Sequence, residues 1–243
     1  MVFVYPGMRK LETKTCLIVL DAILPVKPQL ETTFNHLISL VRMVKLLGKL
    51  RAKYETIMKP IGSSLGRTGL TPNEISTLSL VVAVLAGVAY AYRSPILGAI
   101  CLLISGAIDM LDGAVARAMG TVTRFGAVYD PVLDRYAEWA VLFGIGLGGF
   151  AVWTWVIFGL FGMVMASYTR ARAESAGGLD SCRVGIAERQ EKIILLVLGS
   201  FLQPFFAPAV AVSVLVVGIL SHITVVQRLH FTLIQTRGST THV

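Results

Sequence analysis

Six apolar segments follow one another between residues 75 and 226, separated by short connections that carry glycine, proline or charged residues. Most of them approach the ~20 residues that an α-helix needs to cross the hydrocarbon core of a bilayer, and the fifth is the shortest. Glycine is frequent in the third and fourth segments, which allows neighbouring helices to approach closely. The pattern predicts an all-α integral membrane protein with six transmembrane helices. The segments are residues 75–92, 96–118, 126–149, 153–173, 192–206 and 209–226.

The residues before the first apolar segment have a different pattern. Residues 43–58 place leucine, tyrosine, isoleucine and methionine roughly on one side of a helix and lysine and arginine on the other. This is typical of a helix in the interface of an anionic leaflet, although a solvated helix has the same pattern. We therefore expect a cytoplasmic extension with an N-terminal amphipathic interfacial helix (1–59), a membrane domain (60–230) and a cytoplasmic tail (231–243).

The composition supports the membrane assignment. Of the 243 residues, 55% are hydrophobic and only 15% are charged, whereas charged residues make up about 25% of a soluble domain. The three cysteines are far apart, odd in number and without metal-binding spacing, so we expect free thiols rather than a disulfide framework. A single integral membrane domain fits these features better than soluble domains.

The charged residues predict the orientation of the chain. Six spans place every lysine and arginine except Arg93 on the same side as both termini, and all 14 acidic residues lie on that side too. The positive-inside rule assigns this side to the cytoplasm. We therefore expect an integral protein of the cell membrane whose termini and carboxylate-containing site face the cytoplasm.

Four aspartates interrupt the apolar pattern of the second and third segments. Asp109 and Asp112 are three residues apart and share a helix face, and Asp130 and Asp134 are four apart and share another. The stretch between the two pairs is long enough for a helix end, a short turn and a return, so the pairs meet near the cytoplasmic end of the bundle. An ionisable group in hydrocarbon costs roughly 2.5–3.5 kcal/mol on insertion scales, so we interpret the four carboxylates as a functional site.

The chemistry of this cluster indicates a divalent metal site that handles phosphate. Carboxylate oxygens suit Mg²⁺ or Mn²⁺, and a pair of metals is a recurring solution for displacement at phosphorus. Gly113, Ala116 and Gly126 leave room for a bulky group beside the backbone, and the guanidinium of Arg117 matches the geometry of a phosphate. The alternative, that the aspartates cap helix ends or form ion pairs, explains one or two of them more readily than four.

At these residues the sequence resembles a known family. The stretch from Asp109 to Asp134 fits the pattern D-x2-D-G-x2-A-R-x8-G-x3-D-x3-D at every fixed position, which is the signature of the CDP-alcohol phosphotransferases. The resemblance covers roughly residues 60–230 and implies a membrane enzyme in which a hydroxyl attacks the β-phosphorus of a CDP-linked lipid and CMP leaves. It also implies a homodimer, for which the glycine-rich third and fourth segments are a candidate interface.

The resemblance further implies roles for individual residues. Asp109, Asp112 and Asp130 would be ligands of two metal ions, and Asp134, also close to the metals, would be the general base that accepts the proton of the alcohol. Proton loss to water is the alternative to Asp134. A Pro-Asn pair before the first span matches the family and implies a cytidine contact. The implied CDP-binding residues are Pro72, Asn73, Asp109, Asp112, Gly113, Ala116, Arg117 and Gly126.

A second group of charges, between the fourth and fifth segments, concerns the acceptor. Arg170, Arg172, Arg183, Arg189 and Lys192 crowd one cytoplasmic turn. Such a group either anchors the helices by the positive-inside rule or binds an acceptor that itself carries a phosphate.

This turn resembles one branch of the family. The stretch YTRARAE, followed by G-x2-E-R-x2-K, is similar to prokaryotic phosphatidylinositol-phosphate synthases and archaeal archaetidylinositol-phosphate synthases, which use inositol 1-phosphate. By this resemblance, Arg170, Arg172 and Arg189 would grip the inositol phosphate and Lys192 would assist. The branch often has lysine at position 170 and arginine at position 192, so this chain keeps both charges with a different donor geometry.

We therefore expect a transferase of phospholipid biosynthesis that joins a diacyl or archaeal ether lipid group from a CDP-lipid to inositol 1-phosphate, with no nucleic-acid partner. Within the enzyme class, glycerol 3-phosphate is the alternative acceptor, because it needs the same cationic grip. From a different class, a divalent-cation transporter also places carboxylates in a helix bundle. Transport favours acidic residues near mid-membrane or at both mouths, whereas those of this chain lie near one face.

Overall fold

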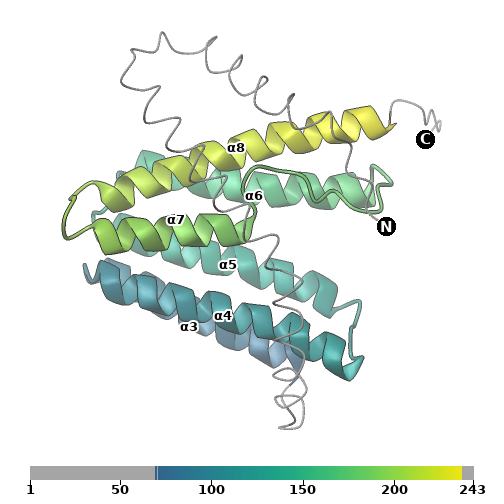
Figure 1. Ribbon diagram of the computed structural model, residues 1–243, viewed down its shortest axis with the longest axis horizontal. Helices are drawn as coiled ribbons and strands as arrows, with labels where there is room; N and C mark the ends of the chain where they lie inside the picture. Colours follow the sequence, from purple (N-terminus) through teal and green to yellow (C-terminus); the bar gives the residue numbers. More distant parts are fainter. Residues whose placement is uncertain (1–68, 70, 237–243) are drawn as a thin grey trace. The chain divides into compact units, whose positions relative to one another are not determined.

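The computed structural model describes residue 69 and residues 71–236, which form six α-helices and contain no β-strand. By its contacts the chain divides into Met1–Leu47 and Gly48–Val243, and every described residue belongs to the second unit. The interfacial helix predicted at residues 43–58 lies outside the described residues. The helices, labelled in Figure 1, are α3 (Pro72–Ala91), α4 (Pro95–Met119), α5 (Gly126–Leu147), α6 (Trp153–Ser175), α7 (Arg189–Leu202) and α8 (Ala209–Thr236).

The first helix begins earlier than its apolar pattern predicts, because a capping box starts it. The Oγ1 of Thr71 accepts a hydrogen bond of 3.3 Å from the Glu74 N–H, and Oε2 of Glu74 accepts one of 2.8 Å from the Thr71 N–H. Pro72 occupies the first turn, where its missing N–H costs nothing. Pro72 and Asn73 therefore lie inside the first turn of α3 rather than in a linker before it.

The six helices pack as a closed ring. Helix α3 packs against α4 and α5, α4 against α7, α7 against α8, α8 against α6, and α6 against α5. Each helix therefore has two main neighbours. Helices α4 and α7, which are far apart in the sequence, lie next to each other in this ring (Figure 1).

Glycines bring α3 and α5 close together. A Cβ added at Gly87 would strike the carbonyl group of Ala140, and a Cβ added at Gly144 would strike the carbonyl group of Gly87. In α6, a Cβ at Gly162 would lie 2.9 Å from the ring of His222 in α8. The close helix packing predicted from the glycines of the third and fourth segments is confirmed at Gly144 and Gly162. The predicted dimer interface on these segments stays a prediction.

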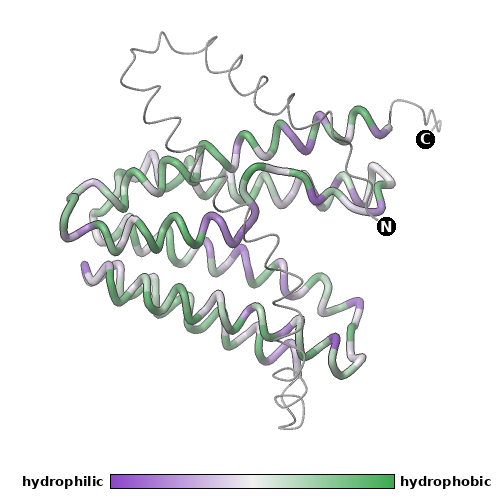
Figure 2. Tube along the Cα trace, viewed as in Figure 1, coloured by the Kyte–Doolittle hydropathy of each residue, from purple (hydrophilic) through white to green (hydrophobic). Residues whose placement is uncertain are grey.

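The described helices have the surface of an integral membrane protein. Leu85, Ile157 and Phe161 are 53%, 61% and 58% exposed, which would favour aggregation in water and suits contact with lipid. Figure 2 shows hydrophilic residues near the start of α7, around the turn between α4 and α5 and toward the ends of α6 and α8, while the rest of the helices are mainly hydrophobic. The charged site is thus built at one end of a largely apolar bundle.

Helix length and composition single out three of the six helices as membrane spans. Helices α3, α4 and α8 are long and apolar enough to cross a bilayer. Helices α5 and α6 have 22 and 23 residues but a more polar composition. Helix α7 has 14 residues, about 21 Å, which is short of the ~30 Å hydrocarbon core. The predicted all-α membrane fold is confirmed for the described residues, and the count of six spans stays a prediction. Helix α8 continues to Thr236, beyond the predicted boundary at residue 230.

Candidate functional site

Three of the four motif aspartates, two from α4 and one from α5, place their carboxylates close together. Asp109, Asp112 and Asp130 each place one carboxylate oxygen within 4.8 Å of the other two. Asp112 is 7% exposed. Its Oδ2 accepts a hydrogen bond of 2.6 Å from Ser76 Oγ of α3, and its Oδ1 accepts one from the Gly113 N–H. The Oδ1 of Asp130 is buried without a hydrogen-bond partner among the described residues. Anionic oxygens this close, one of them unpartnered, fit a cation such as Mg²⁺ or Mn²⁺.

The fourth aspartate is held by an arginine from α7. The Nη1 of Arg189 lies 2.6 Å from Oδ1 of Asp134 and 2.5 Å from Oδ2 of Asp109. Arg189 is the first residue of α7, so these contacts fix the start of that helix against α4 and α5. The structure therefore brings a predicted acceptor-binding arginine directly beside a predicted metal ligand and the predicted base.

An ion pair between two residues outside the predicted site, Arg135 and Glu138, lies next to Asp134 along α5. The Nη2 of Arg135 lies 2.8 Å from Oε1 of Glu138, and its Nη1 donates a hydrogen bond to Ser167 Oγ of α6. Glu138 is 8% exposed, and Lys192 of α7, which is a predicted acceptor-binding residue, is also buried at 5% exposed. The sequence offered one signal, because Glu138 follows Asp134 by four residues and so shares its helix face. The contact of Arg135 with Ser167 of α6 is visible only in three dimensions.

The predicted CDP-binding residues lie at the ends of α3, α4 and α5. A Cβ added at Gly126, the first residue of α5, would lie 3.2 Å from Oδ1 of Asn73 in the first turn of α3. A Cβ added at Gly113 would lie 3.1 Å from Nη1 of Arg117 in the next turn of α4. The structure therefore places Asn73 beside Gly126, at the start of α5. The missing side chain of Gly113 leaves room for the guanidinium of Arg117. The two remaining residues of the set are Pro72 at the start of α3 and Ala116 near the end of α4.

The two predicted acceptor-binding arginines of α6 do not reach the carboxylates. The Nε of Arg170 lies 3.0 Å from Oε1 of Glu174, and the same oxygen accepts a hydrogen bond of 2.9 Å from the Cys182 N–H. Arg172 is exposed. No ion pair within residues 71–236 links either arginine to a motif aspartate. Arg170 is instead connected through Glu174 to the loop of residues 176–188.

A buried arginine of α8, also not predicted, holds the same loop from the other side. Arg228 is 6% exposed. Its Nε donates to the Val184 carbonyl at 2.8 Å, and its Nη1 donates to the Ala166 carbonyl at 2.5 Å. Gly185 has a φ of 151°, and a Cβ there would lie 2.5 Å from Cγ2 of Thr224. The loop that leads to Arg189 is thus fastened to both α6 and α8. The only sign of Arg228 in the sequence was that it carries a charge just beyond the last predicted span, 209–226.

The sequence matches a known protein family over most of the described residues. The family model described as CDP-alcohol phosphatidyltransferase matches residues 69–234, which include every predicted site residue. The archaetidylinositol phosphate synthase of Pyrococcus horikoshii is 38% identical over 185 residues, which is 76% of this chain and 95% of that protein.

Solved structures of one similar protein have the same fold. The crystal structure of Mycobacterium tuberculosis phosphatidylinositol phosphate synthase with CDP-DAG bound is 33% identical, with a TM-score of 0.65 over 73% of this chain and 94% of that one. The structure of the same synthase in complex with manganese and citrate is 32% identical, with a TM-score of 0.64 over 72% of this chain and 88% of that one.

Proposed function

The chain belongs to the CDP-alcohol phosphatidyltransferase family, and from this premise we propose that it synthesises a phospholipid in the membrane. It transfers a phosphatidyl-type group, with diacyl or archaeal ether chains, from a CDP-lipid to a hydroxyl of inositol 1-phosphate and releases CMP. The observation that carries the proposal is the contact of Arg189 with two motif aspartates. It joins a phosphate-matching cation to a carboxylate cluster that fits divalent metal ions.

The choice of acceptor rests on the arginine-rich turn and on the relatives. The relatives named above are an archaetidylinositol phosphate synthase and a phosphatidylinositol phosphate synthase, which favours inositol 1-phosphate over the alternative, glycerol 3-phosphate. The same relatives favour a transferase over a divalent-cation transporter.

The proposed reaction is a displacement at phosphorus. A hydroxyl oxygen of inositol 1-phosphate forms a bond to the β-phosphorus of the CDP-lipid, and the bond from that phosphorus to the bridging oxygen breaks. The electron pair leaves with CMP, and the hydroxyl proton leaves the new phosphodiester. The chain's part is to hold the two phosphorylated substrates in line, which supplies much of the rate enhancement in such transfers.

The metal part of the proposal uses the four motif aspartates. Asp109, Asp112, Asp130 and Asp134 would hold two ions of Mg²⁺ or Mn²⁺. When bound, such ions neutralise the pyrophosphate and stabilise the phosphate of the departing CMP. The close carboxylates and the unpartnered Asp130 oxygen support this assignment, as does a similar synthase that was crystallised with manganese. Metal analysis of the purified protein should find two ions per chain.

Asp134 is the proposed acceptor of the hydroxyl proton. One of its oxygens contacts Arg189, and the carboxylate lies one turn from Asp130 on the same face of α5. Asp134→Asn keeps the size of the side chain but removes its basicity, so we expect kcat to fall by about 10²–10⁴-fold. Asp180→Asn, in the exposed part of the 176–188 loop, is the control and should keep full turnover. Full turnover of Asp134→Asn would mean that the proton goes to water.

The two proposed substrate pockets, one for CDP and one for the acceptor, lie at the ends of the helices. We assign the CDP group to the mouth formed by α3, α4 and the start of α5, where Asn73 lies against Gly126 and Arg117 against Gly113. Pro72, Ala116 and the motif aspartates complete that mouth. We assign the acceptor phosphate to the mouth formed by α6 and α7. Its proposed ligands are Arg170, Arg172, Arg189 and Lys192.

The arrangement in the membrane belongs to the same proposal. The protein has six spans in one membrane domain (residues 60–230), preceded by an interfacial helix and followed by a short tail. The active site and both termini face the cytoplasm, which the distribution of lysine and arginine supports. The family resemblance further supports a homodimer, which native mass spectrometry in detergent would test.

Purified protein should release CMP from a CDP-lipid when Mg²⁺ or Mn²⁺ and inositol 1-phosphate are both present. Release should stop when the metal is chelated and return when it is restored. If no phosphorylated alcohol supports metal-dependent release of CMP, the proposed reaction is wrong.

A further inference from the structure

Glu138 is a buried carboxylate that the proposed reaction leaves unassigned. It lies in the interior of α5, one helical turn beyond Asp134, and it is 8% exposed. Its Oε1 accepts a hydrogen bond of 2.8 Å from Nη2 of Arg135, whereas its Oε2 has no partner among the described residues. Buried side-chain polar atoms are mostly hydrogen-bonded, so an unpartnered carboxylate oxygen requires an explanation.

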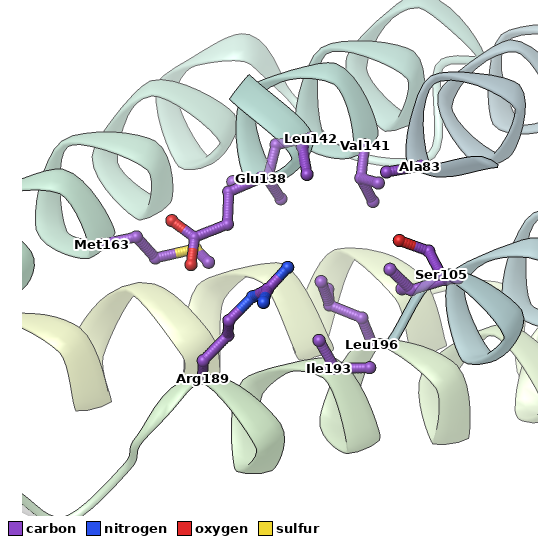
Figure 3. A pocket seen from close by; sticks show the side chains of 11 residues that line it. Ala83, Ser105, Glu138, Val141, Leu142, Met163, Arg189, Ile193 and Leu196 are labelled. Atoms are coloured by element: carbon purple, nitrogen blue, oxygen red, sulfur yellow. The ribbon is translucent and has the colours of Figure 1, made fainter. Parts of the chain in front are cut away.

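Glu138 also lines a small cavity between five helices. The cavity has a volume of about 20 Å³, which is enough for one water molecule. Its lining is mostly apolar, and Glu138 and Arg189 are its two charged residues. Figure 3 shows Glu138 reaching down from α5 and Arg189 reaching up from α7 toward one another across this space.

Arg189 supplies the donor that matches the free oxygen of Glu138. Its Nη1 is engaged by Asp109 and Asp134, but its Nε is buried and has no hydrogen-bond partner among the described residues. The cavity is therefore lined by one side chain with an unused acceptor and one with an unused donor. A water molecule can accept from the Nε–H and donate to the carboxylate, so a single water would satisfy both.

Glu138 also balances the positive charges around it. Besides its ion pair with Arg135, it interacts electrostatically with Arg189 and with the buried Lys192. Arg135 in turn donates to Ser167 of α6. Hydrogen bonds connect Ser167 of α6 to Glu138 of α5 through Arg135, and the cavity separates Glu138 from Arg189, the first residue of α7. The guanidinium of Arg189 is the one that the proposed function assigns to the acceptor phosphate.

We propose that Glu138 is a positioning residue, which fixes the guanidinium of Arg189 at the acceptor site through one water molecule bound in this cavity. The inference rests on the proposed function for the role of Arg189. Glu138 does not touch the substrate. It holds the Nε edge of Arg189 so that the Nη atoms face the motif aspartates and the acceptor phosphate with a fixed orientation.

The water itself is tested by an experimental structure that resolves ordered solvent. We expect one water within hydrogen-bond distance of both Glu138 Oε2 and Arg189 Nε. A dry cavity, or a direct contact between the two side chains, would overturn the proposal. This readout does not depend on activity, so it remains decisive if the proposed acceptor is wrong.

The role of Glu138 is tested by separating the KM for each substrate from kcat. Glu138→Leu removes both the charge and the hydrogen bonds, and we expect the KM for inositol 1-phosphate to rise about 10- to 100-fold, by analogy with the range for residues that orient metal-binding side chains. The KM for the CDP-lipid should stay within about twofold. Glu138→Gln keeps hydrogen-bonding groups at the same place and should recover most of the loss. Equal changes in both KM values would indicate a general structural role and overturn the proposal.

Filling the cavity gives a second test that leaves every charge in place. Ala83 and Ala86 are both 0% exposed and one turn apart on α3, but only Ala83 lines the cavity. Ala83→Val should displace the water and raise the KM for inositol 1-phosphate, whereas Ala86→Val should leave the ratio of the two KM values unchanged. The same ratio in both variants would contradict the proposal, and this comparison remains available if Glu138→Leu does not fold.

Arg189→Lys separates the inference from the proposed function on which it rests. If Arg189→Lys leaves the KM for inositol 1-phosphate unchanged, the acceptor role of Arg189 is wrong, whatever Glu138 does. If Arg189→Lys raises that KM and Glu138→Leu does not, the acceptor role stands and the positioning role of Glu138 is wrong.

Discussion

Arg189 is the residue at which the two predicted parts of the site meet. Its place in the sequence assigns it to the acceptor, yet its Nη1 contacts Asp109 and Asp134 of the carboxylate motif. An arginine can serve both parts because its guanidinium has several donors in one plane. Such a group suits the boundary between two phosphorylated substrates.

The metal assignment can be tested at a single residue. Asp112→Asn keeps the volume of a buried side chain and a group that can accept from Ser76, but it removes the negative charge. We expect the affinity for Mn²⁺ to fall by at least the ~10- to 100-fold that loss of an outer partner of a metal ligand costs, measured by the paramagnetic resonance of free Mn²⁺. Asp180→Asn, an exposed position outside the cluster, should bind Mn²⁺ like the unmodified protein. Equal affinity in Asp112→Asn would remove Asp112 from the ligand set.

Residue types and spacing indicated the motif aspartates because four carboxylates in apolar segments stand out against their surroundings. Glu138 and Ser76 did not stand out. In the sequence, Ser76 looks like any serine of the first span. Only the structure shows that its Oγ lies 2.6 Å from Oδ2 of Asp112. Glu138 becomes a candidate for a role at the site because it pairs with Arg135 and shares a cavity with Arg189. The contact of Ser76 with Asp112 and the position of Glu138 opposite Arg189 join residues that are distant in the sequence, so a pattern along one segment does not contain them.

At the scale of helices, the hydropathy pattern predicted the elements well and their ends less well. Helix α3 starts at Pro72 because Thr71 and Glu74 cap it, and a cap is a polar signal that hydropathy does not register. Helix α7 starts at Arg189, three residues before its apolar run, because ion pairs with Asp109 and Asp134 hold its first turn. The ends that matter for the site are thus fixed by polar residues outside the apolar pattern.

The contact between α3 and α5 predicts a strong effect of a small substitution. A Cβ at Gly144 would strike the carbonyl of Gly87, so Gly144→Ala must push the two helices apart. Overpacking costs about 1–3 kcal/mol, which corresponds to a fall of roughly 2–12 °C in Tm for a chain of this size. In Gly106→Ala the nearest atom would be Ile193 Cδ1 at 3.8 Å, so this control should keep its Tm. Thermal unfolding in detergent measures both, and equal Tm values would contradict the close contact.

At the scale of the whole molecule, the ring of helices explains how distant segments build one site. Helix α4 brings Asp109, helix α5 brings Asp134, and helix α7 inserts Arg189 between them. The neighbours in the ring could not be read from six similar apolar segments, because hydropathy does not say which helix packs on which. The two-segment motif did predict that α4 and α5 bring their aspartates together, and this is confirmed for Asp109, Asp112 and Asp130.

The orientation of the molecule in the membrane can be tested with single cysteines. In a variant without the three native cysteines, Tyr92→Cys lies after α3, where Tyr92 is 82% exposed, and Asp180→Cys lies in the exposed part of the 176–188 loop. We expect a membrane-impermeant maleimide to label position 92 from outside intact cells and position 180 only in inside-out vesicles. Labelling of both positions from the same side would contradict the proposed six-span arrangement.

The central claim is that this chain joins a CDP-lipid to inositol 1-phosphate. The most direct measurement gives purified protein a CDP-lipid, Mg²⁺ and one acceptor at a time: inositol 1-phosphate, glycerol 3-phosphate, serine or free inositol. CMP and the lipid product are then measured by mass spectrometry. We predict that inositol 1-phosphate alone supports efficient release of CMP, with one inositol-phosphate lipid formed for each CMP. Efficient turnover with glycerol 3-phosphate and none with inositol 1-phosphate would contradict the account.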